Sequence, residues 1–187
     1  MTRGAARVLD EYLAASARAG DRVAFARLAV RWQPKLLAHA YRLMGDMEFA
    51  RDVAQESWGD IAKALPRLRD SAVFPAWSYR IVTRRAADAI KRLQRERKTN
   101  AAYAAEPADN VSTTDAMEAS ADSSPLNKAI AALPPQQRAA IALHYKEDLS
   151  IAEIAAVLEV PTGTVKTRLM HARRKLRDAL EGGNSNE

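Results

Sequence analysis

The ten residues VPTGTVKTRL, from Val160 to Leu169, gather small, hydroxyl-bearing and basic side chains at the expected start of a helix. At about 100° per residue, one side of this helix is an apolar stripe made of Val165, Leu169, Ala172, Leu176 and Leu180. The opposite side carries Gly163, Thr167, Met170 and Arg174, flanked by Lys166, His171 and Arg173. Such a face suits contacts with DNA base edges and phosphates, although a solvated basic face on a core helix is the simpler alternative.

The elements that precede this helix favour the DNA interpretation. Residues 150–158 predict a short helix in which Ser150 and Glu153 form a capping box. Its core stripe is Ile151, Ile154, Ala155 and Leu158. A break at residues 159–161 leads into the next helix, and another helix is expected from Leu133 to about Lys146. A capped helix, a tight turn and a helix with small residues at its entry are typical of helix-turn-helix proteins, which read DNA with the start of the second helix.

The N-terminal half contains a second set of helices and all three tryptophans. Gly20-Asp21 and Gly45-Asp46 each predict the end of one helix and the N-cap of the next. The following apolar stripes are Phe25, Leu28, Trp32, Leu36 and Leu43, with a bend at Pro34, and then Ala50, Val53, Ala54, Ser57, Ile61 and Leu65.

A third helix is expected from about Pro75, and its surface is strongly basic. Its apolar positions are Trp77, Ile81, Ala89 and Leu93. The basic positions are Arg80, Arg84, Arg85, Lys91, Arg92, Arg95, Arg97 and Lys98. The N-terminal half therefore ends in a helix that is suited to contact an anionic partner.

Residues 99–126 differ in composition from both flanking regions. They contain Glu106, Asp109, Asp115, Glu118 and Asp122 and no lysine or arginine. With little to bury, this stretch is expected to be an acidic linker. The sequence thus predicts an all-α protein of two small helical modules, residues 1–98 and 127–187, joined by a flexible acidic linker. About 28 extended residues reach roughly 90 Å, which exceeds the ~70 Å covered by two turns of DNA.

Composition excludes several classes of function. The chain has no cysteine, so disulfides, zinc–thiolate sites and thiol catalysis are excluded. The only histidines, His39, His144 and His171, have no metal-binding spacing, and we expect no metal and no cofactor. No apolar run approaches the ~20 residues of a membrane helix, and Asp10 and Glu11 interrupt any signal sequence, so we expect a cytoplasmic protein with no membrane insertion. The net charge of +6 fits a nucleic-acid partner.

Three stretches, in order, resemble RNA polymerase sigma factors of the extracytoplasmic-function (ECF) group. They are ARDVAQESW, FPAWSYRIVTRRAADAIKR and LPPQQRAAIALHYKEDLSIAEIAAVLEVPTGTVKTRLMHARRKL. The first two resemble the family's AEDLVQExF and FxxWLYRIAxNxxxDxxRR patterns of the second conserved region, and the third resembles the fourth region. The resemblance implies a transcription initiation factor that binds core RNA polymerase and recognises the −10 and −35 elements of promoters.

The resemblance also implies roles for particular residues. Core polymerase, through the clamp helices of its largest subunit and its flap, would be bound with the help of Asp52, Gln55 and Glu56. The −10 element would be contacted by Arg80, Arg84, Arg85, Asp88 and Arg92, with Arg84 at a position where the family often has Asn. The −35 element would be contacted by Thr164, Lys166, Thr167, Arg168, Met170, His171 and Arg174. The family resemblance implies an anti-sigma factor as a further partner.

Other interpretations of the same features stay open. The protein is alternatively a stand-alone helix-turn-helix regulator whose first module dimerises or binds a ligand. The acidic face of residues 52–56 is alternatively only solvated, and the linker is either a passive tether or a segment that enters the polymerase. We do not expect an enzyme, because no carboxylate constellation and no phosphate-binding glycine loop is recognisable.

Overall fold

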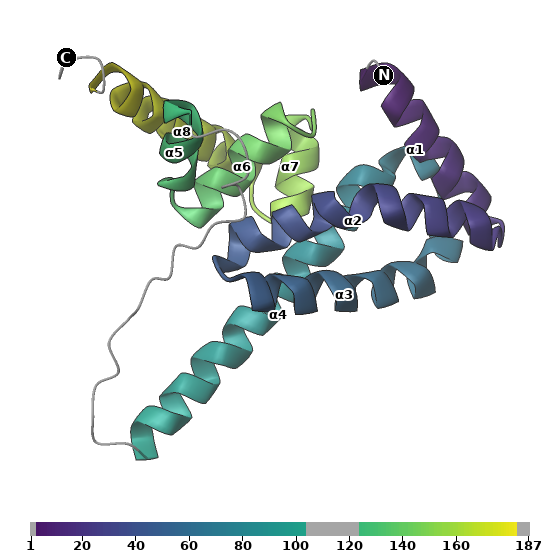
Figure 1. Ribbon diagram of the computed structural model, residues 1–187, viewed down its shortest axis with the longest axis horizontal. Helices are drawn as coiled ribbons and strands as arrows, with labels where there is room; N and C mark the ends of the chain where they lie inside the picture. The colour runs from purple at the N-terminus through teal and green to yellow at the C-terminus, as the bar shows by residue number, and fades with distance from the viewer. Residues whose placement is uncertain (1–2, 104–123, 183–187) are drawn as a thin grey trace.

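The computed structural model describes residues 3–103 and 124–182, and the regular elements in these ranges are helices (Figure 1). The first range contains α1 (Arg3–Arg18), α2 (Arg22–Met44), α3 (Met47–Ala64), the short 3-10 turns η1 (Leu65–Arg67) and η2 (Ser71–Val73), and α4 (Phe74–Tyr103). The second contains α5 (Pro125–Ala131), α6 (Pro135–Tyr145), α7 (Ile151–Leu158) and α8 (Thr162–Gly182). We call α1–α4 the N-terminal module and α5–α8 the C-terminal module. The all-α expectation is confirmed.

The expected helix boundaries at the two Gly-Asp pairs are confirmed. Gly20 and Gly45 have φ values of +100° and +76°, a conformation that glycine adopts without steric cost. The side chain of Asp21 accepts hydrogen bonds from the backbone N–H groups of Val23 and Ala24, and Asp46 accepts one from Phe49. Between these boundaries α2 runs without interruption through Pro34.

The N-terminal module packs around an aromatic cluster on α2 and α4. Trp32 is buried and meets Phe74 edge-on at 5.2 Å between ring centroids, and Tyr79 lies 5.5 Å from it. The most deeply buried apolar residues of α4 are Phe74, Tyr79, Val82 and Ala86. The apolar positions of this helix that were expected to face the core, Trp77, Ile81, Ala89 and Leu93, are only half-buried. The helix contacts α2 and α3 and also α7, so its buried surface is wider than one stripe.

The C-terminal module is built on α6, whose centre is buried. On α8 the predicted stripe holds for its first part, since Val165, Leu169 and Ala172 are buried and Leu176 is half-buried. Leu180 is exposed, which corrects the expectation that the stripe continues to that residue. Residues 177–181 are exposed as a group, so the last turns of α8 have left the module's core.

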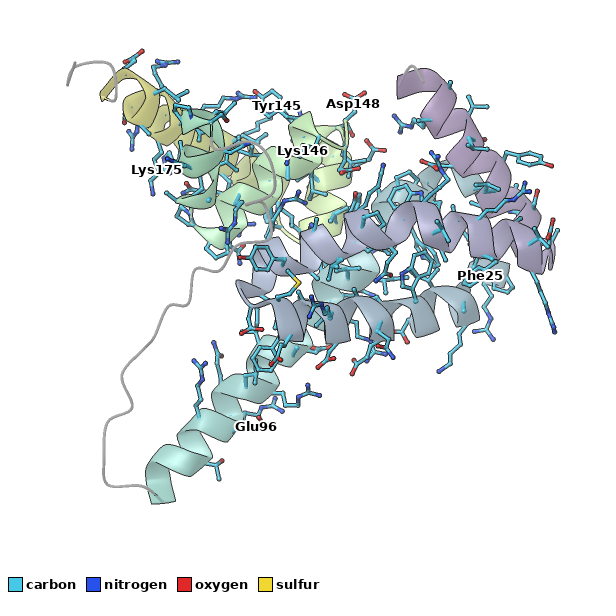
Figure 2. All side chains as sticks on the ribbon, viewed as in Figure 1. Phe25, Glu96, Tyr145, Lys146, Asp148 and Lys175 are labelled. Atoms are coloured by element: carbon cyan, nitrogen blue, oxygen red, sulfur yellow. The ribbon has the colours of Figure 1, made fainter. Side chains whose placement is uncertain are left out.

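Helices extend into both ends of the predicted linker, residues 99–126. Helix α4 continues to Tyr103, and α5, which the sequence analysis did not predict, begins at Pro125 after Ser124 caps it by accepting a hydrogen bond from the Asn127 N–H. The remainder of the predicted linker, residues 104–123, lies outside the described residues. The far half of α4, which includes Glu96, extends away from the other helices (Figures 1 and 2).

The two modules pack against each other. Helix α6 contacts α2, and α7 contacts α4, above the point where α4 leaves the bundle (Figure 1). The buried apolar side chains of both modules belong to one cluster. Among the described residues, no helix has both the length and the apolar character needed to cross a membrane.

Candidate nucleic-acid interface

The structure builds the predicted helix-turn-helix from α7 and α8. The capping box is confirmed: the Glu153 N–H donates to the Ser150 hydroxyl, and the Ser150 N–H donates to the Glu153 carboxylate at 2.8 Å. Helix α7 ends at Glu159 in the left-handed conformation. The carbonyl of Pro161 then accepts hydrogen bonds from the N–H groups of Thr164 and Val165 and starts α8.

Burial on α8 separates its two faces as the periodicity predicts. Val165 and Leu169 anchor the helix in the core, and Lys166, Thr167, Met170 and Arg174 are exposed. Thr164 and His171 are half-buried at the edges of this surface. The Met170 side chain is 56% exposed, so it presents an apolar surface on this side of the helix. We call Lys166, Thr167, Met170 and Arg174 the α8 face.

The hydroxyl group of Thr167 is partly committed to the backbone. It donates to the carbonyl of Gly163 at 3.0 Å, which leaves its oxygen lone pairs facing outward. Nothing in the fold requires glycine at position 163, because a Cβ atom built there would meet no atom within 4 Å. The missing side chain therefore leaves open space at the entry of α8, where a phosphate can approach backbone N–H groups.

Two basic residues of α8 lie apart from this face. Arg168 is half-buried, its Nη1 atom has no hydrogen-bond partner, and burial lowers the pKa of its guanidinium. Arg173 donates to the hydroxyl of Tyr145 at 2.9 Å and lies over that ring, 5.7 Å from the centroid. Arg168 therefore borders the module interior, which its position in the sequence does not reveal.

On α3, the polar residues singled out from the sequence form one exposed face. Asp52, Gln55 and Glu56 are exposed, and the residues between them, Val53 and Ala54, are buried. This alternation fixes the orientation of the acidic side chains. A shallow cleft between α3 and α4 is lined by Phe49, Asp52, Val53, Glu56, Arg85, Asp88, Ala89 and Arg92.

Arg85 is held by carboxylates of α3. Its guanidinium donates two hydrogen bonds to Asp60, one of them at 2.7 Å from Nη2, and a third to Glu56 at 3.1 Å. The hydrogen bonds from Arg85 lower the pKa of the Asp60 carboxyl. Asp60 was not among the residues predicted from the sequence, although its position one helical turn after Glu56 places both carboxylates on the same face of α3.

Arg80 and Arg84 face the other module. Their Nε atoms donate to the same oxygen of Glu159, at 3.0 Å and 2.6 Å, and these hydrogen bonds, that of Arg84 first, lower the pKa of the Glu159 carboxyl. The predicted −10 set is thus divided: Arg80 and Arg84 lie toward α7, and Arg85, Asp88 and Arg92 lie beside α3. Asp88 and Arg92 are exposed.

The histidines take ordinary positions. His39 is fully buried between α2 and α4, where its Nε2 atom shares a hydrogen bond of 2.9 Å with the Thr83 hydroxyl. Burial, reinforced by Arg42, lowers its pKa to about 3. Within the described ranges, no group of three or more His, Asp or Glu side chains is placed to hold a metal ion.

Comparison with known proteins assigns both modules. The family model "Sigma-70 region 2" matches residues 28–96, and "Sigma-70, region 4" matches residues 124–176. The ECF RNA polymerase sigma factor SigW of Bacillus subtilis is 31% identical over 170 residues, covering 86% of this chain and 91% of the relative. The RNA polymerase sigma-H factor of Pseudomonas aeruginosa is 31% identical over 182 residues, covering 92% of this chain and 94% of that protein.

Solved structures agree on the fold. The sigma factor RpoE from Bartonella quintana, crystallised with the anti-sigma factor NepR, has a TM-score of 0.65 at 24% identity and covers 84% of this chain and 96% of its own. CnrH, solved with the cytosolic domain of CnrY, has a TM-score of 0.59 at 27% identity, over 93% of this chain and 98% of its own. Both sigma regions are matched, and the curated relatives are about 31% identical over nearly the whole chain. The chain therefore belongs to the ECF family of RNA polymerase sigma factors, which direct the polymerase to promoters.

Proposed function

We propose that the α8 face of the C-terminal module recognises the −35 promoter element. The observation that carries this proposal is the separation of faces on a capped helix-turn-helix: Val165 and Leu169 are buried, and Lys166, Thr167 and Met170 are exposed near the start of α8. Lys166 and Thr167 can bond to base edges, and Met170 offers an apolar surface to a thymine methyl group. Arg174 supplies a phosphate contact. Thr164 and His171, at the edges, would contribute less, and Arg168 would support the helix from within.

The N-terminal module is proposed to hold core polymerase and to open the −10 element. Asp52, Gln55 and Glu56 form the proposed contact with the polymerase clamp helices, because they are exposed on one face of a rigid helix. Arg80, Arg84, Arg85, Asp88 and Arg92 are proposed to contact the −10 DNA, and the arginines among them chiefly contact its backbone. Of the arginines, Arg80, Arg84 and Arg92 are exposed and can reach phosphates, and Arg85 orders the α3–α4 surface.

The protein is proposed to act in the cytoplasm as an initiation factor rather than as an enzyme, since its partner is core polymerase. RpoE was solved with the anti-sigma factor NepR, and CnrH was solved with the cytosolic domain of CnrY. We extend this kind of regulation to the present chain and propose an anti-sigma factor that engages both modules.

Transcription by the reconstituted holoenzyme tests the assignment. The full chain is combined with core polymerase and assayed on promoters with intact and with scrambled −35 elements. Lys166→Ala and Thr167→Ala should each lower initiation roughly tenfold on intact promoters, as expected for one lost base contact. On scrambled promoters the variants should equal the wild type. Equal losses on both promoter sets would contradict the −35 assignment, and specific duplex binding without polymerase would favour a stand-alone regulator.

A further inference from the structure

Four ion pairs among the described residues cross the interface between the two modules, and these four have the same orientation. The bases come from the N-terminal module and the acids from the C-terminal module: Arg7–Glu153 at 3.4 Å, Lys35–Glu147 at 3.2 Å, Arg80–Glu159 at 3.0 Å and Arg84–Glu159 at 2.6 Å. The packing of α7 on α4 and of α6 on α2 brings these groups together. The C-terminal module therefore presents an acidic edge to a basic surface of its own chain.

Glu159 occupies a backbone position that does not favour glutamate. It caps α7 with φ +53°, in the left-handed region where glycine or asparagine is usual. Its backbone N–H bonds to the Ala155 carbonyl, and glycine would make the same bond. Capping therefore does not explain the side chain. What the side chain adds is one carboxylate oxygen that accepts hydrogen bonds from both Arg80 and Arg84.

Arg80 and Arg84 lie one turn apart on α4, and both guanidinium groups point to the same acceptor. A carboxylate that receives two arginine N–H groups imitates the geometry and charge of a DNA phosphate. These arginines belong to the set that the proposed function assigns to the −10 DNA, so the following inference rests on that assignment.

We propose that the closed arrangement of the two modules is an autoinhibited state in which Glu159 occupies the phosphate site of Arg80 and Arg84. In this state the C-terminal module covers part of α4. The C-terminal module must move away before α4 can engage the −10 DNA. Core polymerase and promoter DNA hold the two modules on separate promoter elements and so supply the interactions that favour the open state.

The ion pairs across this interface suit a state that opens reversibly. The side chains of Arg80, Arg84 and Glu159 are 45%, 58% and 41% exposed, so water and salt screen their attraction. The residues between Tyr103 and Pro125 would reach roughly 70 Å when extended, about two turns of DNA. The chain can therefore exchange the closed state for one in which both modules contact a promoter.

Energy transfer between two dyes measures closure directly. The chain has no cysteine, so Lys63→Cys on α3 and Asp178→Cys on α8, both at exposed positions, give specific labelling sites. Glu159→Gln should lower the ratio of closed to open molecules about threefold to tenfold at low salt, as expected for two half-exposed ion pairs. The difference should shrink at about 1 M salt, where the Debye length is about 3 Å.

Two further variants distinguish the effect of the Glu159 charge on closure from the effect of its left-handed backbone. Glu159→Gly suits the left-handed backbone and removes the carboxylate, so it should open the chain as Glu159→Gln does. Asp148→Gly relieves the same kind of strain, at φ +57°, at an exposed position outside the interface ion pairs, and should leave closure unchanged. Unchanged energy transfer in both Glu159 variants, or equal opening by Asp148→Gly, would overturn the proposal.

Binding of a labelled 20-nucleotide single-stranded oligonucleotide to the full chain, without polymerase, tests whether Glu159 masks Arg80 and Arg84 from DNA. Glu159→Gln should bind it three to ten times more tightly than wild type, and the further replacement of Arg80 and Arg84 by alanine should remove the gain. Opening without tighter binding would refute masking. Failure of the holoenzyme to initiate transcription would instead contradict the proposed function, because the closure measurement contains no polymerase.

Discussion

Helix α4 carries two arginine–carboxylate sites that connect different parts of the molecule. Arg85 is bound by Asp60 and Glu56 within the N-terminal module, across the α3–α4 contact. Arg84, the adjacent residue, is bound by Glu159 of the C-terminal module. The first site lies within one folded module, and the second lies between two modules, so its carboxylate can be exchanged for another anion when the modules separate. The same side-chain chemistry thus stabilises one module on one side of the helix and, in the proposed closed state, joins the two modules on the other.

The largest effect is expected from acid, which should destabilise the N-terminal module through buried His39 before it affects the Arg84–Glu159 site. The folded chain keeps His39 neutral because burial lowers its pKa to about 3, whereas the unfolded chain protonates it below pH 6.5. The unfolded state then binds more protons, so this stabilisation is complete above pH 6.5 and is lost as the pH falls toward 3. The free energy of unfolding should fall by about 2 kcal/mol between pH 6.5 and 5.

Chemical denaturation across this pH range measures the loss, and His39→Gln should flatten the slope. Glu159 behaves differently, since its pKa is lowered and its carboxylate stays ionised until the pH falls below its ordinary value of 4.5. Its contribution to closure is present above that value and lost below it. Closure measured by energy transfer should therefore not weaken between pH 6.5 and 5 through Glu159. A pH-independent unfolding free energy would contradict the account of His39.

Charge reversal on α3 should distinguish the polymerase contact from the Arg85 site. Asp52→Lys should weaken core binding about tenfold, corresponding to about 1.4 kcal/mol, through lost attraction to the clamp. Glu56→Lys should weaken binding similarly and also lower stability, because Glu56 accepts a hydrogen bond from Arg85. Binding to immobilised core polymerase and thermal unfolding give the two readouts. Unchanged affinity in both variants would show that this face is only solvated.

Removal of single arginines should break one site at a time. Arg85→Ala should cost about 1 kcal/mol of unfolding free energy, because a fork of hydrogen bonds to half-exposed carboxylates is lost, with no change in closure. Arg84→Ala should do the reverse, opening the chain and leaving the stability of the N-terminal module unchanged. The two variants are matched neighbours on α4. If both altered closure equally, the two sites would not be separable.

The smallest effect is expected at Gly163. Because the backbone there is an ordinary helix and a Cβ atom meets nothing within 4 Å, Gly163→Ala should stabilise the chain by roughly 0.5 kcal/mol. If the open space admits a phosphate, the same variant should weaken −35 binding by the holoenzyme. Thermal unfolding and promoter binding measure the two effects. Higher stability with unchanged promoter binding would show that the space is unused.

Local features of the chain were predictable because they depend on neighbouring residues. The caps at Asp21 and Asp46 and the capping box of Ser150 and Glu153 join groups two or three residues apart. The inner and outer faces at the start of α8 follow from helical periodicity alone. The all-α class, the helix-turn-helix and the exposed acidic face of α3 therefore came from the sequence.

Tertiary structure decided which of the predicted side chains are accessible. The half-burial of Arg168, the exposure of Leu180 and the deep positions of Tyr79 and Val82 depend on which helices pack nearby. The partner of Arg84 lies 75 residues away in the chain, and no periodicity connects two residues at that separation. Amino-acid type determined that α4 is basic, and long-range packing decided which of its arginines meet the protein's own carboxylates.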